Sequence, residues 1–147
     1  MWARLGLETR AQRAWALYDW ANSAFMTTVV AAVFPVYYKQ VIAGGLDPAV
    51  ADGRYSAATA IGLACVALAG PLLGRLADRY AKRKLLLFGF TLVGAVATMA
   101  LSFAGAGDVT YALAFFALAN LGAGAAVVFY DSLLPHIARH DQLDQVS

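Results

Sequence analysis

This chain has little of what a catalytic or disulfide-bonded domain is built from. It contains one cysteine, Cys65, so no disulfide can form within the chain. Its two histidines, His136 and His140, lie in a polar tail and are better explained as solvated side chains than as a metal site. We find no nucleophile–base pair, phosphate-binding glycine loop or metal-ligand spacing. We therefore expect no enzyme, no metal, no cofactor and no nucleic-acid partner.

Charged residues are also scarce, at 14% of the chain, whereas hydrophobic residues make up 61%. The mean hydropathy is +0.64. Because ordinary soluble domains are about 45–50% apolar, this composition favours an integral membrane protein. The start does not resemble a cleavable signal peptide, because charges keep it polar and no small-residue cleavage site follows a short apolar core. These charges are Arg4, Glu8, Arg10 and Arg13.

Four apolar segments are each long enough to cross a bilayer core, which takes roughly 20 residues in a helix. They predict an all-α integral membrane protein whose 147 residues form a single transmembrane domain. The predicted helices cover residues 14–38, 55–77, 85–104 and 109–134. A loop is expected at 78–84, and a tail at 135–147 because Pro135 should end the fourth helix.

Lysine and arginine are distributed unevenly over the two sides of this arrangement. Three lie in the N-terminal lead, five in the stretch from 74 to 86 and one in the tail. The opposite side carries two, Lys39 and Arg54. Because basic residues are retained on the cytoplasmic side, this bias predicts a multi-pass protein of the cell membrane with both termini in the cytoplasm.

Polar side chains form a stripe along the first predicted helix. Asp19, Asn22 and Ser23 recur at the three- and four-residue spacing that places side chains on one helix face. An acid within a span costs about 2.5–3.5 kcal/mol on insertion scales, so Asp19 is expected to face a cavity, water or a partner. Alternatively Asp19 lies near the cytoplasmic end, where its aromatic neighbours Tyr18 and Trp20 are favoured at the interface.

The fourth predicted helix has a polar face and a run of small residues. Asn120, Gly124 and Asp131 share a face, because eleven residues are close to three helical turns. Glycine and alanine at 122–126 allow another helix to approach closely. The third predicted helix carries no charge, so we expect it to be a supporting, lipid-facing helix. Its polar residues are Thr91, Thr98 and Ser102.

The stretch Gly74–Leu86 has the sequence G-R-L-A-D-R-Y-A-K-R-K-L-L. It resembles the signature loop between the second and third helices of the major facilitator superfamily, G-x-L-A-D-R-x-G-R-K-x-x-L. Arg83 stands in the lysine position of that pattern, Lys82 replaces an arginine and Ala81 replaces the second glycine. The matching residues are Gly74, Leu76, Ala77, Asp78, Arg79 and Leu86. The alternative is that this basic loop serves only to set topology.

Two further segments point to one branch of that superfamily. W-A-L-Y-D-W-A-N-S-A-F, at Trp15–Phe25, resembles the opening helix of the vacuole effluxers, which include the autophagy-related vacuolar amino-acid permeases. F-Y-D-S-L-L-P, at Phe129–Pro135, is similar to the end of their fourth helix. The resemblance implies export of small solutes, amino acids among them, by a secondary active transporter that works by alternating access.

Such transporters have twelve spans in two six-helix halves around a midplane site. The resemblance therefore implies that this chain is an N-terminal fragment, the first part of the N-terminal half. Its expected partners are a small-molecule substrate, the lipid bilayer and the missing C-terminal helices. The expected substrate-binding residues are Tyr18, Asp19, Asn22, Ser23 and Asn120. The expected gating cluster at the cytoplasmic face is Asp78, Arg79, Arg83 and Asp131.

Two other functions are compatible with four spans. One is a complete four-helix exporter of the small multidrug resistance kind that acts as a dimer, since those proteins also carry an acid in the first helix. The charge bias, the loop pattern and the long first connection weigh against it. The other is a non-transporting membrane scaffold or accessory subunit, which would have no need of Asp19.

Overall fold

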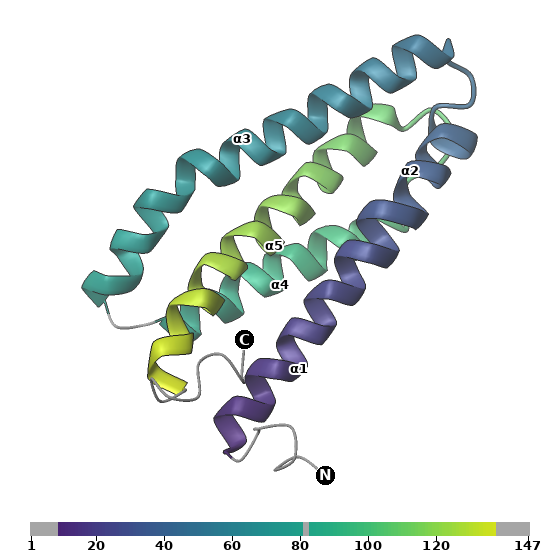
Figure 1. Cartoon of the computed structure of the whole chain (residues 1–147). Coiled ribbons are helices and arrows are strands. Elements are labelled where there is room, and N and C mark those ends of the chain that lie inside the picture. Colours follow the sequence, from purple (N-terminus) through teal and green to yellow (C-terminus); the bar gives the residue numbers. More distant parts are fainter. Residues whose placement is uncertain (1–8, 81–82, 138–147) are drawn as a thin grey trace.

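The computed structural model describes residues 9–80 and 83–137, and places the side chains of 9–75 and 83–133. Over this part the chain is all-helical, with four helices long and apolar enough to cross a membrane, which confirms the predicted fold class. The first is one rod, shown in Figure 1, made of α1 (Arg10–Ala24), the π-helical η2 (Phe25–Val33), α2 (Phe34–Tyr37) and the π-helical η3 (Tyr38–Ile42). The others are α3 (Pro48–Tyr80), α4 (Arg83–Leu101) and α5 (Val109–Ile137).

The first two helices begin earlier than hydropathy alone predicted, because polar caps start them. Thr9 caps α1 in a reciprocal arrangement: its hydroxyl accepts from the Gln12 amide at 3.2 Å, and its own amide donates to the Gln12 side chain at 2.9 Å. The Asp47 carboxylate likewise accepts from the Ala49 amide at 2.9 Å, and Pro48 opens α3. Most of the connection expected at 39–54 is therefore helical.

The connection and tail predicted at the other end are also shorter than expected. α3 continues to Tyr80 and α4 starts at Arg83, so most of the loop predicted at 78–84 is helix. α5 passes through Pro135 and ends at Ile137, two residues beyond the predicted stop. Proline at this position removes one hydrogen bond to the preceding turn, and the final turn of the helix tolerates that loss.

α5 lies at the centre of the bundle, where it packs against both α3 and α4 (Figure 1). A Cβ atom built on Gly122 would lie 2.6 Å from the Gly94 amide nitrogen of α4. On the α3 side, a Cβ on Gly124 would lie 2.9 Å from both methyl groups of Val66. The small residues predicted to permit close approach therefore do so on two faces. α4 is thus more than the lipid-facing support that was expected.

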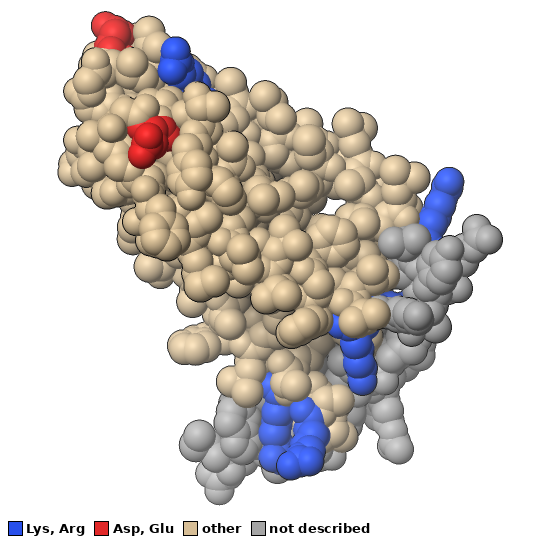
Figure 2. Space-filling model, turned by 180° about the vertical axis from the view of Figure 1, so that it is seen from behind, with Lys and Arg blue, Asp and Glu red and all other residues tan. Residues whose placement is uncertain are grey.

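On the face shown in Figure 2, charged side chains lie at the two ends of the bundle. We call the end with the connections 43–47 and 102–108 the loop end, and the end where α1 begins and α5 finishes the terminus end. At the loop end Lys39 Nζ lies 2.8 Å from a carboxylate oxygen of Asp52. On the face shown in Figure 2, an uncharged band separates this end from the basic side chains at the opposite end. A band without charge is what a membrane core requires.

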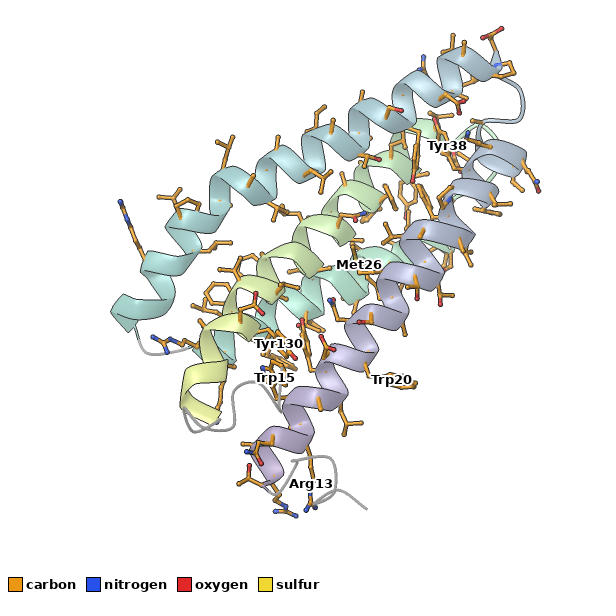
Figure 3. The ribbon with its side chains drawn as sticks, in the orientation of Figure 1. Arg13, Trp15, Trp20, Met26, Tyr38 and Tyr130 are labelled. Carbon is orange, nitrogen blue, oxygen red and sulfur yellow. The ribbon has the colours of Figure 1, made fainter. Side chains whose placement is uncertain are left out.

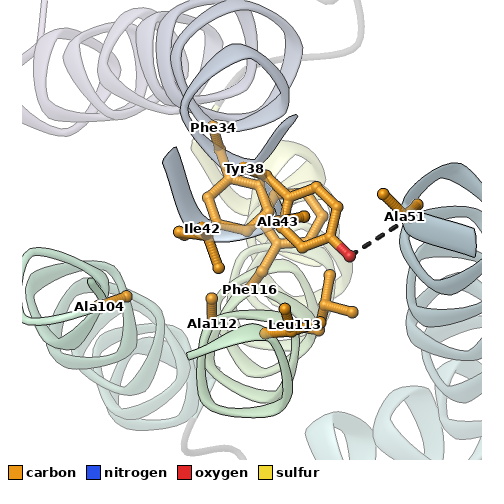
Figure 4. Close-up of a cluster of buried hydrophobic side chains, with 10 residues drawn as sticks. Phe34, Tyr38, Ile42, Ala43, Ala51, Ala104, Ala112, Leu113 and Phe116 are labelled. Carbon is orange, nitrogen blue, oxygen red and sulfur yellow. Dashed lines mark hydrogen bonds between the residues drawn. The ribbon is translucent and has the colours of Figure 1, made fainter. Parts of the chain in front are cut away.

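The first rod alternates between outward and inward side chains (Figure 3). Trp20 projects away from the other helices and is 73% exposed, whereas Tyr38 points into the bundle and is fully buried. Tyr38 belongs to the aromatic core of the loop end (Figure 4), where Phe34 stacks on Phe116 with ring centroids 4.0 Å apart. The Tyr38 hydroxyl donates to the Ala51 carbonyl at 3.3 Å, and this ties the rod to α3.

Candidate functional site

A pocket of about 370 Å³ lies between α1, α4 and α5. Tyr18 and Asn22 enter its wall from α1, and Thr91 and Thr98 from α4. The remaining lining residues are Ala21, Phe25, Gly94, Ala95, Ala119 and Ala123. The pocket lies in the bundle because small residues leave space there that no large side chain fills.

The hydroxyl groups of the two threonines add little polarity to this wall, because both are already hydrogen-bonded within α4. The Thr91 hydroxyl donates to the Leu87 carbonyl at 2.8 Å, and the Thr98 hydroxyl donates to the Gly94 carbonyl at 2.8 Å. These bonds to the preceding turn satisfy the hydroxyl hydrogens within α4. The Tyr18 hydroxyl approaches Thr91 Oγ1 at 3.4 Å, which links α1 to α4 at the pocket. The pocket therefore suits an apolar group.

An aromatic contact joins α1 to α5 beside this pocket (Figure 3). Trp15 and Tyr130 point toward each other from the two helices, with ring centroids 4.5 Å apart and planes within 12°. Tyr18 lies against the same Tyr130 ring at 5.0 Å. Trp15, Tyr18, Asp19 and Asn22 follow the i, i+3, i+4 and i+7 spacing of one helix face. That face of α1 is therefore the one that meets α5.

Two carboxylates accompany these rings. Asp19 of α1 and Asp131 of α5 are exposed, and they lie close enough to interact electrostatically. The Tyr130 hydroxyl experiences the charges of both. Tyr130 is only 5% exposed, and its hydroxyl has no hydrogen-bond partner among the described residues. The site therefore holds two accessible acids and a buried phenol with unused hydrogen-bonding capacity.

The predicted substrate-binding residues have different environments in the structure. Tyr18 and Asn22 line the pocket, and Asp19 lies on the same face of α1. Ser23 is exposed, and its carbonyl accepts the Thr27 hydroxyl at 2.8 Å. The Asn120 amide donates to the Phe116 carbonyl of its own helix at 2.8 Å, and Asn120 does not line the pocket.

The predicted gating residues are only partly described. The side chains of Asp78 and Arg79 lie outside the described residues. Arg83 donates from Nη1 to the Ser132 carbonyl at 3.2 Å, which ties the start of α4 to the end of α5. Among the placed side chains no ion pair joins Arg83 to Asp131, and Asp131 instead lies within electrostatic reach of Asp19. The structure therefore groups Asp131 with the α1 site.

Four residues of this region were not predicted as site residues. Trp15 lies one turn before Asp19, and Tyr130 directly precedes Asp131, so both were adjacent to predicted positions. Thr91 and Thr98 are seven residues apart, which is two helical turns, on a helix without a charged residue in its membrane part. This spacing could have indicated a second polar face directed at the pocket.

Comparison with known proteins agrees with this architecture. The family model described as vacuole effluxer Atg22 like matches residues 54–146. An uncharacterised MFS-type transporter of Bacillus subtilis (strain 168), YxiO, is 33% identical over 140 residues, which are 95% of this chain and 33% of that protein. The chain thus spans about a third of the length of this relative. No solved structure matches the chain.

Proposed function

The chain belongs to the vacuole effluxer family of MFS-type transporters, and from this premise we propose that it supplies the first four spans of a transporter for small solutes. The observation that carries the proposal is the pocket between α1, α4 and α5 with an acid pair beside it. Sites of this kind lie between helices within the membrane, where ionisable residues are rare unless they have a function. The further spans of the transporter would close the site.

Alternating access requires one part of the bundle to move while another part stays in place. The aromatic core of the loop end and the close Gly94–Gly122 contact are rigid elements. Near the terminus end, Trp15 and Tyr18 of α1 lie against the Tyr130 ring of α5, and Tyr18 approaches Thr91 of α4 at 3.4 Å across the pocket. We propose that α1 moves against the α4–α5 pair there. A solute would shift this equilibrium by binding one arrangement more tightly than the other.

The direction and location of transport belong to the same proposal. The excess of lysine and arginine at the terminus end supports placing that end in the cytoplasm of a cell membrane. A pocket between α1, α4 and α5 would take up solute from the cytoplasm, and the family name favours efflux. The same family match weighs against the four-helix dimeric exporter and the scaffold.

Filling the pocket tests the proposal. The complete gene product would be reconstituted in proteoliposomes with Ala123→Leu, which adds a side chain to the pocket wall, and the release of preloaded amino acids would be measured. We expect release to fall by about tenfold or more, because the solute would have to share the pocket with the added leucine. Overpacking of this kind costs about 1–3 kcal/mol. Ala67→Leu, on an exposed face of α3, is the matched control and should leave release unchanged. Equal release from both variants would overturn the assignment of the pocket.

A further inference from the structure

We propose that the ring stack between Trp15 of α1 and Tyr130 of α5 is a latch, and that two polar atoms buried in it favour its opening. The inference rests on the proposed movement of α1 and names the residues that set its equilibrium. Three features support it: the aromatic character of the contact, the polar atoms buried within it, and the hydrogen bonds that hold the opposite end of the rod.

The contact between α1 and α5 is limited and aromatic. α5 packs extensively against α3 and α4 but touches α1 far less. Trp15 stacks on Tyr130 with ring centroids 4.5 Å apart, and Tyr18 lies against the same ring at 5.0 Å. Ring pairs attract each other at centroid separations of about 4.5–7 Å. The rings therefore hold α1 only while it stays close to α5.

The burial of two polar atoms opposes this attraction. The Trp15 indole nitrogen and the Tyr130 hydroxyl are both buried, and neither has a hydrogen-bond partner among the described residues. The indole N–H is a donor, and the phenol is both a donor and an acceptor, so each loses hydrogen bonds to water when the latch closes. The closed latch is thus favoured by the rings and disfavoured by their polar atoms.

Water can reach both atoms once α1 moves away from α5. Trp15 lies five residues after Arg10, the first residue of α1, which is about 7.5 Å at a rise of about 1.5 Å per residue. On the other helix, Asp131 directly follows Tyr130 and is exposed. The latch is therefore close to the aqueous face of the terminus end, and opening would hydrate the two polar atoms.

The opposite end of the same rod is held by polar atoms that have partners. The Tyr37 hydroxyl donates to the Ala104 carbonyl at 2.8 Å, and the Gly107 amide donates to the Ile42 carbonyl at 2.9 Å. Both bonds join the rod to the second connection of the loop end. The π-helical η2 and Pro35 lie between these bonds and the latch, and helices bend at such elements. We therefore expect α1 to pivot at the loop end and to open at the terminus end.

Distances between two spin labels test this in the complete gene product, purified in lipid nanodiscs. The labels are attached at Leu17→Cys on α1 and Leu85→Cys on α4, because both side chains are exposed, and every other cysteine, Cys65 included, is replaced by alanine. α4 packs closely on α5, so this pair reports where α1 lies relative to both. We expect two populations of distances, one that matches the structure, with the latch closed, and one with the latch open. A parent protein with only the distance that matches the structure would overturn the proposal.

Two substitutions remove the polar atoms but keep the rings. Tyr130→Phe, and separately the replacement of Trp15 by naphthylalanine, should each raise the closed population relative to the open one by about tenfold, because a buried polar atom without a partner no longer opposes closure. Tyr38→Phe makes the same change at a hydroxyl that has a partner, so it is the matched control and should leave the populations unchanged. If folded Tyr130→Phe leaves the populations unchanged or shifts them toward the open arrangement, the latch is refuted.

Loss of a whole ring should act in the opposite direction. Trp15→Ala removes the stack, so the open population should rise relative to the closed one by about tenfold or more. Opposite shifts from Trp15→Ala and Tyr130→Phe distinguish a latch from a contact that only stabilises the fold. Circular dichroism checks that both variants are folded. Shifts in the same direction would contradict the proposal.

Transport by the same variants separates this inference from the proposed function. If Tyr130→Phe shifts the distances as expected but releases preloaded amino acids as the parent protein does, the latch stands and the movement of α1 is not part of transport. If the complete gene product releases amino acids while Tyr130→Phe leaves the distances unchanged, the latch fails and the transport function stands.

Discussion

The two ends of this bundle use similar side chains for different purposes. At the loop end Phe34, Tyr38 and Phe116 form a closed core, and the Tyr38 hydroxyl has a carbonyl partner on α3. Near the terminus end Trp15 and Tyr130 also stack, but the Tyr130 hydroxyl and the Trp15 indole nitrogen have no hydrogen-bond partner among the described residues. Satisfied polar atoms stabilise a fold, whereas unsatisfied ones are available to a ligand.

The first rod changes its helical form between these two regions. The π-helical segment η2 (Phe25–Val33) starts at Phe25, a residue of the pocket wall, and ends beside Phe34 of the loop-end core. π-Helical turns are rare and frequently lie at functional sites. The rod therefore has a packed aromatic core at one end, a pocket near the other and a π-helical stretch between them.

The largest expected effect concerns which side of the membrane each end of the bundle faces. Gly45→Cys at the loop end, where a side chain meets nothing within 4 Å, should react with a membrane-impermeant maleimide added outside intact cells. Lys84→Cys at the terminus end, which is exposed, should react only after the cells are permeabilised. The physical reason for this difference in labelling is the excess of lysine and arginine at the terminus end, because basic residues are retained on the cytoplasmic side. Cys65 would be replaced by alanine in both. Labelling of position 84 from outside would reverse the predicted topology.

The second effect concerns the stability of the loop end. Phe116→Ala should lower the free energy of unfolding by about 3–5 kcal/mol, the usual cost of removing a buried phenylalanine. Phe116 is 1% exposed, whereas Phe103 is 80% exposed, so Phe103→Ala is the matched control and should change little. Unfolding in mixed micelles, followed by circular dichroism, measures both. Similar losses for the two variants would mean that the aromatic core does not anchor the bundle.

The third effect concerns the contact that holds α4 and α5 together. Gly122→Ala should cost about 1–3 kcal/mol of unfolding free energy, because the new Cβ would lie 2.6 Å from a backbone atom of Gly94. Gly89→Ala on α4, where a Cβ meets nothing within 4 Å, should be neutral or slightly stabilising. If Gly122→Ala unfolds at the same denaturant concentration as Gly89→Ala, the helices have room to separate and the α4–α5 pair is not rigid.

Much of this molecule was predictable from local patterns. The four apolar runs gave the number and order of the helices, and the three- and four-residue spacing placed Asp19 and Asn22 on one face. Helix ends were less predictable, because Thr9 and Asp47 act as caps beyond the apolar runs. The electrostatic influence of Asp19 on Asp131 was missed, since it depends on how α5 packs against α1 and not on either helix alone.

The smallest expected effect compares the two tyrosines directly. Tyr38→Phe removes a hydroxyl that donates to the Ala51 carbonyl, so it should lower the free energy of unfolding by about 0.5–1.5 kcal/mol. Tyr130→Phe removes a buried hydroxyl that has no hydrogen-bond partner among the described residues, so it should leave stability unchanged or raise it slightly. Both variants keep their rings, and thus any difference between them reports the hydroxyls alone. Unfolding in mixed micelles without added solute measures the pair. If Tyr130→Phe lowers the free energy of unfolding as much as Tyr38→Phe does, the Tyr130 hydroxyl already has a partner in the free protein. It would then not be available to a ligand.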